Sequence, residues 1–119
     1  MQIFKFGGAS VKDAESVQNI VTVLKKTGYT NTLIVVSAMG KTTNALEKVI
    51  NAYFNDRKGL TEAIKESNDY HNQIITQLFP KGHIIFESIK TLFEDLISFL
   101  NRNKSPNYDF VYDLSLIHI

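Results

Sequence analysis

The sequence predicts an α/β protein whose first third forms a parallel sheet and whose remainder is helical. Two apolar runs, 3–6 and 32–36, each end in a loop of small residues, as buried strands do when they turn sharply. Between them, apolar residues recur at intervals of three and four, which indicates an amphipathic helix. The order strand, helix, strand favours a mostly parallel sheet because a helix supplies the crossover.

Length and composition favour a folded globular unit. The 119 residues suffice for one domain with a core, or for part of a larger domain. Hydrophobic residues make up 44% and charged residues 21%, which disfavours disorder. A net charge of +1 gives no broad attraction to nucleic acid or to anionic lipid, so we predict neither partner.

Cysteine is absent, which excludes disulfides and thiolate chemistry in this sequence and fits a reducing compartment. No apolar run has the length that crosses a bilayer, and the first residues do not follow the pattern of a signal peptide. The sequence therefore predicts a cytoplasmic location.

The first predicted helix follows Ser10, which can cap it, and Gly28 is expected to end it in a left-handed conformation. Its apolar face should pack on the sheet and comprises Ala14, Val17, Ile20, Val21 and Leu24. The second strand, 32–36, is almost continuously apolar and is expected to be covered on both faces.

Three further helices are predicted. The first has Thr43 or Asn44 as its cap and ends at a break over 56–59; its apolar face comprises Leu46, Val49, Ile50, Tyr53 and Phe54. Helices over 60–78 and 85–100, separated by Pro80 and Gly82, should form an antiparallel hairpin. Residues 107–119 show no clear period.

The first loop reads KFGGAS, from Lys5 to Ser10. Gly7 and Gly8 allow backbone N–H groups to approach an oxyanion, the next helix directs its positive end there, and Lys5 adds a formal charge. The pattern predicts a phosphate-handling loop. The alternative is a strand-ending turn with an exposed lysine.

The second loop reads VVSAMGKTTN, from Val35 to Asn44. Its Gly-Lys-Thr ending is similar to a Walker P-loop, but that motif needs a glycine at the position of Val35, so we reject the assignment. The short polar side chains that remain are suited to a carboxylate or a phosphate. The alternative is a helix cap with a tight turn, which we favour for Asn44 taken alone.

No metal site is predicted from the side chains. His71, His83 and His118 are far apart and lack ligand-like spacing, so they are interpreted as surface or structural histidines. The acidic side chains of the 85–100 helix are interpreted as solvated charge.

Together, KFGGAS and VVSAMGKTTNAL resemble the aspartate kinases of the amino acid kinase superfamily, whose usual text is KFGGTS and VVSAxxGxTN. Both motifs, their order and their separation agree, and the resemblance spans residues 1–113. It implies the amino-terminal part of an αβα sandwich, with 58–101 as a helical hairpin insertion. It also implies transfer of the γ-phosphoryl group of ATP, with Mg²⁺, to the side-chain carboxylate of L-aspartate. The product, 4-phospho-L-aspartate, serves lysine, threonine and methionine biosynthesis, and the intact enzyme is expected to be a homo-oligomer.

The resemblance assigns roles by position. Lys5 neutralises charge on the transferring phosphoryl group, and the phosphate and nucleotide lie on the loop of Gly7, Gly8 and Ser10. The substrate and the reacting phosphate are surrounded by Ser37, Ala38, Thr43 and Asn44. Phosphoryl transfer depends on residues that position the reactants and compensate their charge more than on covalent participation of the protein.

Two departures from the family text stand out. Ala9 replaces the usual threonine, and residues 114–119 do not continue the family pattern. We therefore expect an inactive amino-terminal fragment with a non-native or truncated tail and with uncovered apolar sheet and helix surface. The alternatives are a kinase for glutamate or acetylglutamate, and a non-enzymatic interaction module that uses the helical hairpin.

Overall fold

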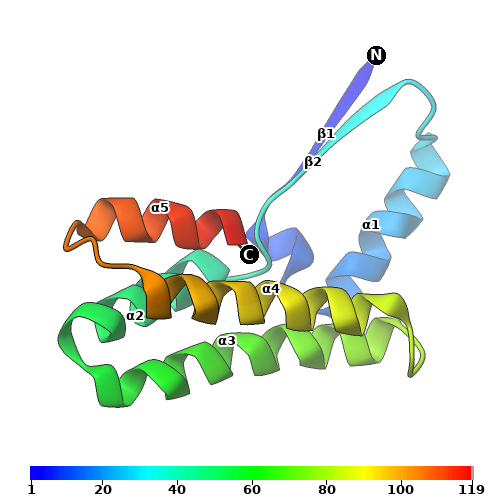
Figure 1. Cartoon of the computed structure of the whole chain (residues 1–119). Coiled ribbons are helices and arrows are strands. Elements are labelled where there is room, and N and C mark those ends of the chain that lie inside the picture. Colours follow the sequence, from blue (N-terminus) through cyan, green and yellow to red (C-terminus); the bar gives the residue numbers. More distant parts are fainter. Residues whose placement is uncertain (119) are drawn as a thin grey trace. The chain divides into compact units, whose positions relative to one another are not determined.

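The computed structural model describes residues 1–118 (Figure 1). Along the chain the elements are β1 (Gln2–Phe6), the 3-10 helix η1 (Gly8–Val11), α1 (Ala14–Thr27), β2 (Thr32–Val36), α2 (Thr42–Asn55), α3 (Arg57–Leu78), α4 (Ile84–Arg102) and α5 (Tyr108–His118). The chain divides into two compact units, Met1–Thr42 and Thr43–Ile119. The predicted combination of helices with a parallel sheet is confirmed, although most of the described chain is helical and its sheet has two strands.

In the first unit, β1 and β2 form a parallel pair. The register runs from Gln2 opposite Thr32 to Phe6 opposite Val36, and the two strands lie side by side in Figure 1. Both strands therefore end at the same edge of the sheet. The loops that follow them leave from the carboxyl edge, where open α/β sheets bind ligands.

The prediction that the second strand is covered on both faces is wrong for this unit. From Leu33 to Val36, the side chains of β2 are 39–55% exposed, and Ile3 of β1 is 64% exposed. An apolar strand is buried on both faces only where other layers cover its sheet. In the first unit the sheet is two strands wide, and the expected uncovered apolar surface is present.

Helix α1 begins later than predicted, and Ser10 is not its cap. The backbone amide of Ser10 donates to the carbonyl oxygen of Gly7 (2.9 Å), which places Ser10 within η1. The cap is Asp13, whose Oδ1 accepts from the amide of Ser16 at 2.8 Å. A carboxylate is well suited to this position because it also faces the positive end of the helix dipole.

Gly28 ends α1 with φ 81° and ψ 152°. The predicted positive φ is confirmed, but the ψ value differs from that of the left-handed helical cap. Of the expected apolar face of α1, Ala14 is buried, whereas Val21 is 47% exposed. The narrow sheet does not cover a helix of this length.

We predict that the cap of α1 weakens in acid. Hydrogen bonds from the side chain and then the backbone of Ser16 lower the pKa of Asp13 below its ordinary 3.8. The ionised carboxylate therefore stabilises α1 above pH 3.8, and this contribution is lost as the pH falls through the lowered folded pKa. The protection of the Ser16 amide, which is the exchange rate of an unstructured chain at the same pH divided by the observed rate, should decrease over that range. Asp13→Asn retains an acceptor without the titration, so an identical acid response in that variant would contradict the prediction.

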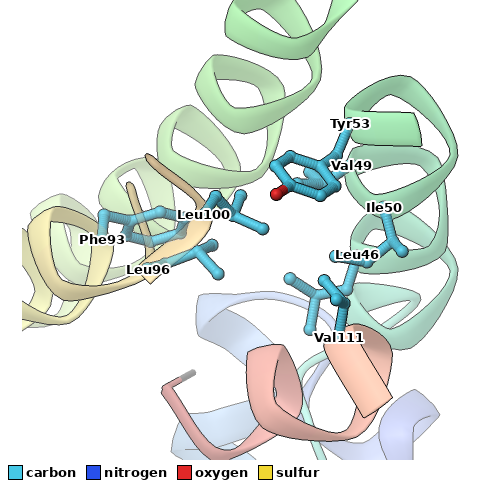
Figure 2. Packing of buried hydrophobic residues seen from close by; sticks show 8 residues of the cluster. All are labelled: Leu46, Val49, Ile50, Tyr53, Phe93, Leu96, Leu100 and Val111. Carbon is cyan, nitrogen blue, oxygen red and sulfur yellow. The ribbon is translucent and has the colours of Figure 1, made fainter. Parts of the chain in front are cut away.

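The core of the second unit lies where α2, α4 and α5 meet (Figure 2). The predicted apolar face of α2 is confirmed, because Leu46, Val49, Ile50 and Tyr53 are buried and Phe54 packs against them. The rest of the cluster is Phe93, Leu96 and Leu100 from α4 and Val111 from α5.

The predicted hairpin is present as α3 and α4, which lie side by side in Figure 1. The break before it is shorter than predicted. Only Asp56 separates α2 from α3, and its Oδ1 accepts from the amide of Gly59 at 3.3 Å. Gly59 thus lies in the first turn of α3 and is not part of a loop.

Helix α5 was not predicted. Val111 and Ser115 are fully buried, and Leu116 packs against the core cluster. Contacts with α4 thus stabilise a segment whose sequence lacks a clear helical period. The predicted tail, 114–119, falls within this helix as far as His118, and Ile119 lies outside the described residues.

Two buried polar side chains of α3 have different environments. His71 is buried, and its Nδ1 lies 2.7 Å from the carbonyl oxygen of Ser67, so the interpretation as a structural histidine is confirmed. The hydroxyl of Ser67 is buried without a hydrogen-bond partner among the described residues. Such a hydroxyl has lost its hydrogen bonds to water without gaining a hydrogen bond within the protein.

We therefore expect Ser67→Ala to leave the unfolding free energy of the second unit unchanged or to raise it by up to about 1 kcal/mol. Ser115→Ala is the matched control, because the equally buried Ser115 hydroxyl donates to the carbonyl oxygen of Val111 at 2.7 Å. Its loss should lower the unfolding free energy by about 0.5–1 kcal/mol. Urea denaturation followed by circular dichroism measures both, and equal losses in the two variants would refute the expectation.

Candidate functional site

The two predicted loops meet in the first unit. Beyond the last strand pair, the amide of Ser37 donates to the carbonyl oxygen of Phe6 at 2.9 Å. Farther along, the amide of Gly40 donates to the carbonyl oxygen of Gly8 at 3.1 Å. The backbone thus joins the KFGGAS loop to the loop after β2 at the carboxyl edge of the sheet.

Lys5 lies on β1 opposite Val35, two residues before the glycine pair, and is exposed. Because side chains alternate between the two faces of a strand, Lys5 lies on the face opposite to Phe4 and Phe6. The stacked rings of these two residues have their centroids 6.1 Å apart. Among residues 1–118, no carboxylate forms an ion pair with Lys5. Its charge is therefore not compensated by an internal partner in the described chain.

The glycine pair occupies two different environments. Gly7 is exposed in an extended conformation, with φ −75° and ψ 175°, and a Cβ atom there meets nothing within 4 Å. Gly8 is partly buried, and a Cβ atom there would lie 2.6 Å from the carbonyl oxygen of Gly40. Gly7 alone thus presents open backbone to solvent.

Ser10 is exposed in η1 and borders a hollow of about 280 Å³ between this helix and α1. Its lining includes the polar residues Ser10, Ser16 and Asn19 and the apolar residues Phe6 and Ile20. The sequence pattern did not identify Ser16 or Asn19, because both lie on a helix whose apolar period dominated the prediction.

In the second loop, Ser37 and Ala38 are exposed. The loop closes at Thr42, which is buried and whose amide and Oγ1 both donate to the carbonyl oxygen of Met39, at 3.0 and 2.6 Å. Helix α2 therefore begins at Thr42. The expectation that Thr43 or Asn44 caps this helix is wrong, because the turn places both inside its first turn.

Thr43 and Asn44 are exposed and belong to the second unit. The structure thus brings together six predicted site residues in the first unit: Lys5, Gly7, Gly8, Ser10, Ser37 and Ala38. Thr43 and Asn44 follow this unit directly in the chain.

The net charge of the first unit favours the binding of an anion. Residues 1–42 contain five lysines but only two acidic residues, Asp13 and Glu15, which gives +3 in a chain with a total of +1. The total charge therefore conceals a positive amino-terminal unit. Such a local excess raises the concentration of anionic ligands near exposed backbone amides.

No group of three or more metal-ligating side chains lies together in the described chain, and the side chain of His118 is outside it. Among the same residues, no helix combines the length and apolarity that crossing a bilayer requires.

Comparison with known families decides the affiliation. The family model for the amino acid kinase family matches residues 1–109, which include both strands, both loops and the α3–α4 hairpin. The chain belongs to the amino acid kinase family. No curated protein matches it.

As an amino acid kinase family member, the chain is assigned to the phosphotransferases in general. The match ends at Asp109, in the first turn of α5, whereas the motif resemblance had suggested residues 1–113. Both glycine-containing loops are well inside the matched range. The positively charged first unit therefore contains both loops at which phosphate chemistry is expected.

Proposed function

We propose that the chain acts in an aspartate kinase, in which the γ-phosphoryl group of ATP is transferred to the side-chain carboxylate of L-aspartate. The observation that carries the proposal is the meeting of the two loops through Gly8 and Gly40 at one edge of the sheet. The motif text supports aspartate as the substrate, and the net charge of +3 on residues 1–42 supports two anionic ligands.

In this proposal, the exposed Gly7 lets phosphate oxygens approach the backbone, and the amides of Gly7 and Gly8 donate to them. Lys5 compensates the negative charge that spreads over the transferring group. Ser37 and Ala38 face the carboxylate substrate, and the resemblance assigns Thr43 and Asn44, in the first turn of α2, to the same ligand. Ser10 borders the nucleotide.

The proposed nucleotide fits the exposed backbone and the unpaired Lys5 of the first unit. ATP supplies the phosphoryl group, and the accompanying Mg²⁺ neutralises phosphate charge. The role of the protein is then positioning and charge compensation.

A substrate panel tests the proposed specificity. With MgATP present, L-aspartate should perturb the amide resonances of Ser37 and Ala38 at lower concentration than L-glutamate or N-acetyl-L-glutamate. Preference for either competitor would replace aspartate with another acid of the same family.

A further inference from the structure

We propose that Gly8 is a positioning residue, which together with Gly40 sets where the second loop lies relative to the first. This inference rests on the proposed function, because it divides the tasks of the two glycines in the KFGGAS loop. Gly7 provides the open approach to phosphate, and Gly8, whose amide also donates to phosphate in the proposed function, provides in addition the space into which the second loop packs.

The first argument is the continuous backbone pairing. The ladder of β1 and β2 ends with Phe6 opposite Val36, and the next bond, from Ser37 to Phe6, continues it into the loops. The bond from the amide of Gly40 to the carbonyl oxygen of Gly8 (3.1 Å) then joins the two loops beyond the sheet. The second loop is therefore attached to the first at two points.

The second argument is steric. A Cβ atom on Gly8 would lie 2.6 Å from the carbonyl oxygen of Gly40 and 3.5 Å from that of Ala38, whereas real Cβ atoms essentially never approach within 3.0 Å. The obstacle at Gly40 is backbone, so it cannot rotate away as a side chain does. A side chain at position 8 must therefore displace the second loop.

The third argument is that the second loop has little freedom to adapt. Gly40 has φ 53°, a left-handed conformation that β-branched residues resist. On its other side, the buried Thr42 closes the turn with two hydrogen bonds to Met39. A displacement caused at Gly8 therefore moves Ser37 and Ala38, where small errors in position are costly for group transfer.

The direct test is hydrogen exchange and amide NMR on the ¹⁵N-labelled 119-residue chain without nucleotide. In the unmodified chain, the Gly40 amide should be protected about 2- to 10-fold, the factor of one ordinary hydrogen bond. Gly8→Ala should abolish this protection and shift the resonances of residues 37–42. Gly7→Ala, which enters open space, should leave both unchanged. An unprotected Gly40 amide in the unmodified chain would overturn the coupling without any variant.

Ligand affinities separate positioning from a merely structural role. Gly8→Ala should weaken L-aspartate binding more than MgATP binding, whereas Gly7→Ala should weaken MgATP binding more than L-aspartate binding. Gly40→Asn, which tolerates positive φ, should retain L-aspartate affinity that Gly40→Val loses. Equal losses for both ligands in Gly8→Ala would overturn the positioning role. If Gly40 is protected but MgATP does not bind, the proposed function fails and the positioning role fails with it, while the loop contact remains.

Discussion

Lys5→Ala should weaken the binding of MgATP to this chain about 10- to 100-fold, the loss expected for one hydrogen bond to a charged group. Lys5 is exposed, lies two residues before the glycine pair and forms no ion pair with a carboxylate among residues 1–118. Removing it therefore breaks no internal ion pair, and the folded state should be preserved. Titration of MgATP followed by amide NMR measures the affinity.

Lys26→Ala is the matched control for this prediction. It removes the same charge from an exposed lysine in the last turn of α1, remote in sequence from both loops. Long-range attraction alone would give the two variants similar losses of affinity, and both losses would diminish as salt is added. A local role for Lys5 requires a clearly larger loss in Lys5→Ala, and equal affinities in the two variants would contradict it.

Leu96→Ala should lower the unfolding free energy of the second unit by about 2–5 kcal/mol. Leu96 is completely buried in the cluster that joins α2, α4 and α5, where a deleted side chain leaves a cavity (Figure 2). A loss of this size approaches the whole stability of a small domain. Urea denaturation should show an earlier transition or a chain that is already unfolded.

Ile97→Ala is the control, because the neighbouring Ile97 is 40% exposed on the same helix. It removes a similar number of carbon atoms but creates little enclosed space, so its cost should be about 1 kcal/mol or less. If the two substitutions cost the same, the cluster of Leu96, Val111 and the α2 face is not the main core of this unit.

Elements with a clear period could be predicted from the sequence. The face of α2 and the α3–α4 hairpin have apolar residues at intervals of three and four over several turns. That spacing determines which side of a helix is buried, whatever packs on it. Glycine and branched residues likewise identified both strands and the edge at which their loops meet.

Features that depend on tertiary contacts were missed. Helix α5 is stabilised by packing of Val111 and Leu116 and not by its own period. The exposure of β2 depends on which layers cover the sheet, and the run of four apolar residues from Leu33 to Val36 carries no information about that. Ser10 could cap a helix in principle, but the 3-10 turn over Gly8–Val11 moved the helix start to Asp13.

The candidate site was predictable in composition and not in internal arrangement. The motifs indicated which residues belong to the two loops. They did not indicate that a Cβ atom on Gly8 would lie 2.6 Å from the carbonyl oxygen of Gly40, because that distance depends on how the loops pack. Nothing in the text KFGG distinguishes the exposed Gly7 from the packed Gly8. Their different environments are known from the structure alone.

A map of amide shifts on addition of MgATP to the labelled chain tests the central claim most directly. We predict that the largest shifts fall on residues 5–10 and 37–42, the two loops that meet in the first unit. They should decrease strongly in Lys5→Ala. Shifts confined to the α3–α4 hairpin, or no saturable shift at all, would contradict the assignment of phosphate binding to these loops.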